Sequence, residues 1–136
     1  MRNDTKYQTR LMMLACALAV LTGTAWATAA DDEADATRIL KRLLGAVEAS
    51  DYDSFVAEGN AVFKAGITKQ MFEGVSTQLS SRMKKGYDTA YLGQLEQQGC
   101  QVYLWKLVFK DAGDDTLATL SLKDGKVAGF WLQSSF

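Results

Sequence analysis

The residue types that could perform acid–base chemistry in this chain of 136 residues are carboxylates and tyrosines, because histidine is absent. The lack of imidazole excludes Ser-His-Asp and Cys-His catalysis and imidazole metal ligands. What remains is chemistry in which a desolvated carboxylate abstracts a proton and a tyrosine stabilises the oxyanion. Asp88 or Glu96 could supply the base, and Tyr87, Tyr91 or Tyr103 could supply the donor.

Each of these candidates also has an ordinary structural explanation. Asp88 follows a helix stop and Glu96 lies beside the Gln97-Gln98-Gly99 turn, where solvated carboxylates are common. Tyrosines on strands usually pack against neighbours while the hydroxyl reaches water. The sequence therefore favours a domain without catalytic residues, and a small-molecule isomerase or lyase that uses a carboxylate and a tyrosine is the alternative.

Metal and cofactor sites are also disfavoured. The Asp111-Ala112-Gly113-Asp114-Asp115 loop gathers three carboxylates, but it lacks the full spacing of a calcium loop and its bidentate glutamate. A hairpin turn is the simpler interpretation. After removal of the first 27 residues only Cys100 remains, so we expect neither an intramolecular disulfide nor a zinc site. The sequence predicts no metal and no cofactor.

Residues 1–27 have the pattern of a signal peptide. An apolar run extends from Leu11 to Leu21, and Ala25-Trp26-Ala27 offers small residues for cleavage. This run is shorter than the roughly 20 residues that a membrane-spanning helix needs. We expect cleavage, no membrane association afterwards, and a periplasmic or secreted location. The basic residues that precede the apolar run are Arg2, Lys6 and Arg10.

The rest of the chain is predicted to form one domain. Residues 28–36 are rich in alanine and acid without apolar periodicity, which predicts a flexible leader before a single domain over residues 37–136. Residues 28–136 hold 12 Lys and Arg against 15 Asp and Glu, a formal charge of −3. Because basic residues are not clustered, we expect no nucleic-acid partner.

Apolar spacing predicts three helices before residue 87. Apolar residues recur every three or four positions from Ile39 to Val47, which indicates the first helix. A short second helix follows a cap at Asp51, an extended piece covers residues 60–65, and a third helix runs from its Thr68 cap to Gly86. The residues predicted to share the apolar face of the third helix are Met71, Phe72, Val75, Leu79 and Met83.

From Tyr87 onward the apolar period changes to two, which predicts strands. The Asp124-Gly125 pair predicts a type I′ turn that fixes the register of the last hairpin. The fold class is therefore α+β, with N-terminal helices packed on a curved antiparallel sheet of about four strands. The strands are predicted near Thr89 to Glu96, Cys100 to Lys110, Thr116 to Lys123 and Lys126 to Gln133.

Both faces of the second predicted strand are largely apolar. One face should receive the helices, and the other then needs a partner, such as a second copy of the chain. A homodimer through the outer face of the sheet is the resulting expectation. The residues that point one way are Tyr103, Trp105, Leu107 and Phe109, and those that point the other way are Val102, Leu104, Lys106 and Val108.

Three helices followed by the tail GQLEQQGCQVYLWKLVFKDAGDDTLATLSLKDGKVAGFWLQ resemble the cone-shaped nuclear transport factor 2-like (cystatin-like) superfamily, across nearly all of residues 28–136. The matching motifs are Leu104-Trp105-Lys106-Leu107 and Gly125-Lys126-Val127-Ala128-Gly129-Phe130, as in small exported bacterial members of uncharacterised function. The resemblance implies a sheet wrapped around the longest helix, a cone whose open end can hold a small molecule, and dimers through the outer sheet face. The superfamily includes enzymes and binding modules, so the fold alone assigns no function.

Aromatic side chains crowd two of the predicted strands and lead to the functional prediction. We expect an exported, non-catalytic domain that binds a small apolar ligand or a protein partner, including itself. The predicted ligand-binding residues are Tyr91, Tyr103, Trp105, Phe109 and Trp131.

Overall fold

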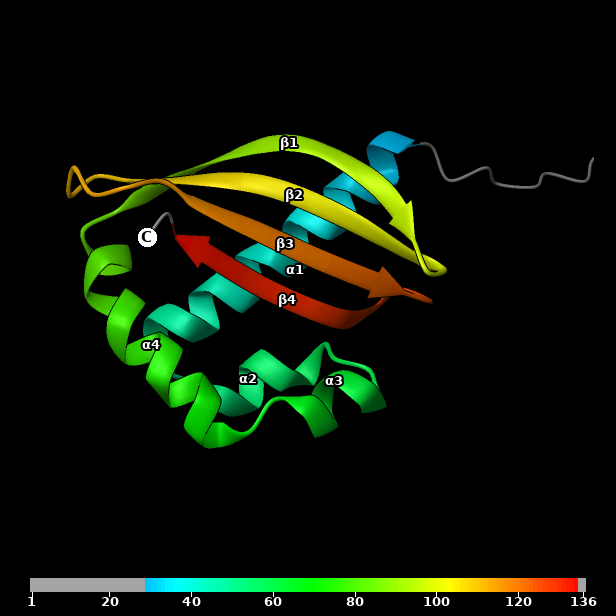
Figure 1. Cartoon of the computed structure of the whole chain (residues 1–136), viewed down its shortest axis with the longest axis horizontal. Helices are drawn as coiled ribbons and strands as arrows, with labels where there is room; N and C mark the ends of the chain where they lie inside the picture. Colours follow the sequence, from blue (N-terminus) through cyan, green and yellow to red (C-terminus); the bar gives the residue numbers. More distant parts are fainter. Residues whose placement is uncertain (1–28, 135–136) are drawn as a thin grey trace, which may run out of the picture.

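The computed structural model describes residues 29–134, which form four helices followed by four strands (Figure 1). The strands pair antiparallel in the order β1-β2-β3-β4, so the predicted α+β class is confirmed. No helix within this range is both long and apolar enough to cross a membrane. The predicted signal peptide lies outside the described residues. The elements are α1 (Ala29–Ala49), α2 (Tyr52–Ala57), α3 (Ala61–Gly66), α4 (Lys69–Lys84), β1 (Tyr87–Gln97), β2 (Cys100–Phe109), β3 (Thr116–Lys123) and β4 (Lys126–Ser134).

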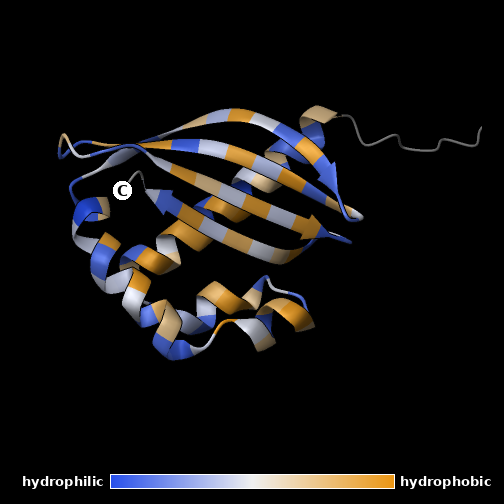
Figure 2. Ribbon diagram, viewed as in Figure 1, coloured by the Kyte–Doolittle hydropathy of each residue, from blue (hydrophilic) through white to orange (hydrophobic). Residues whose placement is uncertain are grey.

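Helix α1, the longest helix, lies along one face of the curved sheet and fills the core (Figure 1). Figure 2 shows hydrophobic residues alternating with polar ones along the strands, as a sheet with one packed face requires. Trp105, only 1% exposed, lies at the centre of this face, with Tyr103 stacked on it at 6.0 Å between ring centroids. The face of β2 that carries Tyr103 and Trp105 is therefore the one that receives α1, a choice that the sequence left open.

The predicted flexible leader at residues 28–36 is wrong for the residues that the structure describes. Residues 29–36 form the first turns of α1, and Ala36 is completely buried. Alanine has the highest helix propensity, and Asp31 and Asp32 in the first turn suit the positive end of the helix dipole. The domain therefore begins earlier than residue 37.

The extended piece predicted at residues 60–65 is also wrong, because Ala61–Gly66 forms helix α3. Its N-cap is Asn60, whose side chain accepts a hydrogen bond from the Phe63 amide at 2.9 Å. A helix this short shows too little periodicity to be recognised, so the cap alone marks its start.

Helix α4 packs mainly on α1 rather than on the sheet. Phe72 and Met83 are buried, but Met71 and Val75 are 56% and 43% exposed. The predicted single apolar face is therefore only partly correct. Ser76 is completely buried between the two helices, where its hydroxyl donates to the Val47 carbonyl at 2.7 Å.

The strand predictions hold with small boundary changes. β1 is longer than predicted and carries a β-bulge at Leu92, between the partners of Trp105 and Leu104. β2, β3 and β4 end within one residue of their predicted ends.

Arg82 of α4 ties the β2–β3 loop to the helical layer. Its guanidinium donates to Asp111 from Nε at 2.8 Å and from Nη2 at 3.2 Å, and it lies 4.1 Å from the centre of the Phe109 ring. The Gly113 amide also donates to Asp111. Asp111 is thus engaged inside a hairpin loop, in agreement with the predicted turn, and within residues 29–134 no acidic group has the arrangement of a metal site.

We predict that the Arg82–Asp111 pair makes the stability of the fold depend on pH in the acid range. The hydrogen bond from Arg82 lowers the pKa of Asp111 from 3.8 to about 2, with a further contribution from the Gly113 amide. A carboxyl with a lowered folded-state pKa stabilises the fold above its unfolded value, and this stabilisation is lost as the pH falls through the folded value. In the Asp111→Asn variant, the loss of thermal stability between about pH 3.8 and pH 2 should shrink relative to the parent protein. If the variant lost as much thermal stability over this pH range as the parent protein, the pairing of Asp111 with Arg82 would be contradicted.

The Asp124-Gly125 turn has the geometry predicted from the sequence, with φ of 52° and 75°. A β-branched residue at a left-handed position costs roughly 1–2 kcal/mol. Gly125→Val should therefore lower the free energy of unfolding by about that amount, measured by chemical denaturation. Gly74 lies inside α4 with open space around its Cβ position, so the control Gly74→Ala should instead stabilise by about 0.5–1 kcal/mol.

Candidate functional site

Two cavities of opposite character lie at the two ends of α1. The first, the apolar groove, has a volume of about 270 Å³ and opens between α4 and β4. The second, the polar cleft, has a volume of about 410 Å³ and opens between the first half of α1 and the tips of the two hairpins. The residues that line the apolar groove are Val47, Phe55, Ile67, Met71, Phe72, Val75, Phe130, Trp131 and Leu132.

Phe55 of α2 joins the walls of the apolar groove. Its ring centroid lies 4.8 Å from that of Phe72 on α4 and 5.9 Å from that of Phe130 on β4. Met71 and Val75 of α4 border the groove with exposed side chains. All nine lining residues are apolar, so the groove offers contact area without a charged or hydroxyl side chain.

Hydrogen bonds outside the groove hold its helical wall in place. The Ser76 hydroxyl bonds the Val47 carbonyl and the Ser50 hydroxyl, which lies 2.6 Å away. The Tyr52 hydroxyl donates to the Ile67 carbonyl at 2.8 Å, just before α4 begins. α4 is therefore positioned by α1 and α2, and the groove remains where α4 does not reach the sheet.

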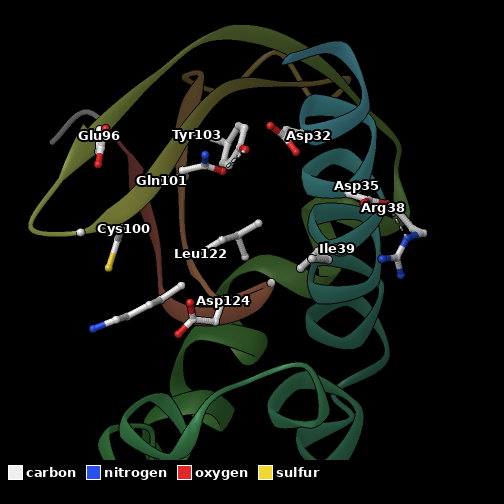
Figure 3. A pocket seen from close by; sticks show the side chains of 13 residues that line it. Asp32, Asp35, Arg38, Ile39, Glu96, Cys100, Gln101, Tyr103, Leu122 and Asp124 are labelled. Atoms are coloured by element: carbon white, nitrogen blue, oxygen red, sulfur yellow. Dashed lines mark hydrogen bonds and ion pairs between the residues drawn. The ribbon is translucent and has the colours of Figure 1, made fainter. Parts of the chain in front are cut away.

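The polar cleft is shown in Figure 3. Asp32 of α1 and Tyr103 of β2 approach each other from facing sides, while Asp35 and Arg38 form an ion pair at 3.6 Å. Glu96 and Cys100 line the cleft from the tip of the β1–β2 hairpin. Cys100 is half-buried and borders this polar space.

The Tyr103 phenol has a raised pKa, because burial disfavours the phenolate and the charges of Asp32, Tyr91 and Asp35 oppose it. Its hydroxyl lies 2.9 Å from the Gln101 side-chain oxygen, to which it donates. The raised pKa of Tyr103 and the hydrogen bond that its hydroxyl donates to Gln101 both favour the protonated phenol. Tyr103 therefore presents a neutral polar group in a fixed position.

The structure separates the acid–base candidates. Asp88 pairs with Val108 on the outer face of the sheet, outside both cavities. Glu96 and Tyr103 do line the same cleft, but the Tyr103 hydroxyl is bonded to an amide oxygen rather than to Glu96. Tyr91 lies 5.7 Å from Trp105 between ring centroids and serves the packing of the inner face.

The five predicted ligand-binding residues do not form one site. Trp105 and Phe109 are core residues, and Tyr103 is buried with one side toward the polar cleft. Tyr91 is half-buried beside Trp105. Trp131 is 55% exposed, points to the outer face, and is the only one of the five that borders the apolar groove.

Sequence reasoning missed the groove residues of α4 and the cleft residues of α1. Met71 and Val75 looked like core positions, because a stripe of apolar residues on a helix does not reveal which members the neighbouring element covers. Asp32 and Asp35 lie in the segment that the sequence predicted as a flexible leader. Asp32, Ala36 and Ile39 are spaced four and three residues apart, as on one face of a helix. This spacing was the signal that the first helix begins before Ile39.

Comparisons with known proteins do not assign a family. No protein-family model matches the sequence, and no curated protein matches it significantly. Among solved structures, one similar chain is an uncharacterized cystatin fold protein from Novosphingobium aromaticivorans, with 13% sequence identity and a TM-score of 0.37. The match covers 71% of this chain and 95% of that chain. At this similarity, no function is carried over.

We predict an alkaline loss of stability that involves Tyr103. Burial raises the pKa of Tyr87, Tyr91 and Tyr103 in the folded state. A group with a raised folded-state pKa stabilises the fold below its unfolded value of about 10, and this contribution is lost as the pH rises further. Denaturant titrations above that pH should show a falling free energy of unfolding, with a shallower fall in Tyr103→Phe. An identical slope in the variant would contradict this assignment.

Proposed function

We propose that the protein is a non-catalytic binding domain that takes up a small, uncharged, apolar molecule in the apolar groove. The observation that supports this proposal is the all-apolar lining of a groove that stays open beside the core. Ligand sites are usually concave and lined mainly by hydrophobic and aromatic side chains. The exported location predicted from residues 1–27 belongs to the same proposal.

The size of the groove limits the ligand. An apolar cavity of about 150 Å³ can take up benzene, so a groove of about 270 Å³ suits a compact molecule of one or two rings. Burial of roughly 300 Å² of ligand and groove surface would supply about 7 kcal/mol, before the entropic costs of association are subtracted. Micromolar or weaker binding is the expected range.

The lining also limits the charge of the ligand. A carboxylate or ammonium inside the groove would lose its hydration without gaining a partner, because no lining side chain carries a charge. Long-chain acids and amines are therefore poor ligands unless their charged end stays in water. A neutral hydrocarbon-like molecule avoids this cost.

The carboxylate-and-tyrosine enzyme is the less supported alternative. The groove lining contains neither a carboxylate nor a tyrosine. In the polar cleft, the Tyr103 hydroxyl donates to Gln101, and the Asp35 carboxylate pairs with Arg38. General acid–base catalysis would require a base and a donor that converge on one substrate position.

Naphthalene is a suitable probe because it is neutral, flat and small enough for the groove. We predict that it raises the melting temperature of the protein, and that Val75→Trp weakens its binding at least ten-fold by filling the groove. Val75 is 43% exposed, so the larger side chain has room and the fold should be retained. Binding is measured by isothermal calorimetry, and native mass spectrometry of the protein from its host shows whether a small molecule co-purifies.

Val62→Trp is the matched control. Val62 lies on α3, is 75% exposed and does not line the groove, so this variant should bind naphthalene like the parent protein. Equal binding by the Val75→Trp variant would exclude the groove as the site, and no binding by the parent protein would remove the proposal.

A further inference from the structure

One edge of the sheet, formed by β4, borders the apolar groove. β4 is the last strand in the sheet order, so one side of its backbone has no neighbouring strand (Figure 1). The groove opens between this strand and α4, and Phe130 and Leu132 of β4 line it. A free strand edge presents backbone N–H and C=O groups that can pair with another chain. The groove therefore lies beside a surface that can form hydrogen bonds as well as apolar contacts.

The start of this edge already pairs with an extended segment of the protein itself. The Asn60 amide donates to the Val127 carbonyl at 2.8 Å, and the Val127 amide donates to the Glu58 carbonyl at 2.9 Å. These two bonds form a parallel bridge between Gly59 and Val127. The edge of β4 thus accepts an added segment at Val127, and that segment ends where α3 begins.

Strand register shows which residues continue the edge beyond Val127. Because both backbone groups of Val127 face away from β3, its partner Leu122 faces β2, and so does every second residue of β3. Beyond the bulge, Phe130 and Leu132 are the β4 partners of such residues. Their N–H and C=O groups therefore face away from the sheet. Within residues 29–134, no backbone group outside the sheet bonds them.

This part of β4 lacks the features that usually protect an edge strand. Proteins prevent unwanted pairing with charged side chains, prolines, bulges or a covering element. From Gly129 to Ser134, β4 contains no charged residue and no proline, and its bulge lies before Gly129. The opposite edge strand, β1, carries Asp88 and Glu96 and has a bulge at Leu92. The edge suited to pairing is therefore that of β4.

We propose that the free edge of β4 binds an extended, uncharged peptide segment of a partner protein as an added strand. The peptide backbone bonds to the outward groups of Phe130 and Leu132, in continuation of the pairing at Val127. Side chains alternate along a strand, so every second residue of the peptide points into the apolar groove. The proposal goes beyond the uptake of a small molecule, but it rests on the groove of the proposed function.

The groove defines which peptide fits. No lining side chain carries a charge, so a charged peptide residue at this position would lose its hydration without gaining a partner. A cavity of about 150 Å³ holds a benzene-sized group, so the groove of about 270 Å³ has room for one large or two small apolar side chains. The stretch at residues 129–134 matches a peptide of about six residues.

A six-residue peptide of alternating threonine and valine, acetylated and amidated at its ends, is a suitable probe. It is uncharged, and both residue types favour strands. We predict that it binds the parent protein in isothermal calorimetry, and that Val75→Trp weakens this binding at least ten-fold by filling the groove. Val62→Trp is the control and should bind the peptide like the parent protein, because Val62 does not line the groove. Circular dichroism checks that both variants are folded.

Amide hydrogen exchange in the parent protein tests the added strand without any substitution. The bound peptide should slow exchange of the Phe130 and Leu132 amides, because both become hydrogen-bonded. Trp131 is the internal control, since its amide faces β3. The slowing at Phe130 and Leu132 should exceed that at Trp131 at least ten-fold. Equal slowing at all three amides, or no binding of the peptide, would overturn the proposal.

Methylation of the peptide nitrogens is a second test of the backbone pairing. In an extended peptide the valine N–H groups face one edge and the threonine N–H groups face the other. One probe carries N-methyl groups on its valines and another carries them on its threonines. Only the probe whose methyl groups face β4 should lose affinity at least ten-fold, namely the first for antiparallel addition and the second for parallel addition. Equal affinities of the two methylated probes would contradict an added strand.

Naphthalene separates this proposal from the proposed function. If naphthalene binds and the peptide does not, the added strand is wrong and the small-molecule site stands. If the peptide binds with the expected amide protection and naphthalene does not bind, the added strand stands and the small-molecule site is wrong. Protection of Phe130 and Leu132 that rises with protein concentration in the absence of peptide would identify a second copy of the chain as the occupant, and would overturn the proposal of a peptide partner.

Discussion

The burial of α1 against the inner face of the sheet is the constraint on which the rest of the structure depends. Its apolar stripe, which includes Leu40, Leu43 and Val47, packs against rings and aliphatic side chains of β2 and β3. A sheet this narrow has room for one long helix on its concave side. α4 must therefore pack on α1, and the space that it leaves beside β4 becomes the apolar groove.

The same arrangement explains why the two cavities differ. The first turns of α1 carry Asp32 and Asp35 toward the hairpin tips, where both side chains line the open polar cleft. At the other end, Phe55 and Phe72 belong to the core, and the groove is a continuation of that core to the surface. Carboxylates and the hydrogen-bonded Tyr103 characterise one end, and apolar side chains alone line the groove at the other.

The sequence predicted correctly those features of the fold that are set by residues close together in the chain. The alternation from Tyr103 to Phe109 and the Asp124-Gly125 turn were correctly interpreted, because strand faces and positive φ are properties of short segments. The start of α1 and the identity of the exposed positions on α4 were missed, since both depend on which distant element covers them. The five aromatic residues grouped as one site are divided by the sheet itself, with Trp131 on one side and Trp105 on the other.

The buried Ser76 hydroxyl has a consequence for how the groove could diverge among related sequences. It fixes α4 to the carbonyl of Val47 by a contact that lies behind the groove and does not involve Met71 or Val75. Side chains at those two positions can therefore change in bulk or shape while the helix axis stays in register with α1. Under the proposed function, the residues that would select the ligand differ from those that hold the scaffold, so either set can change without loss of the other.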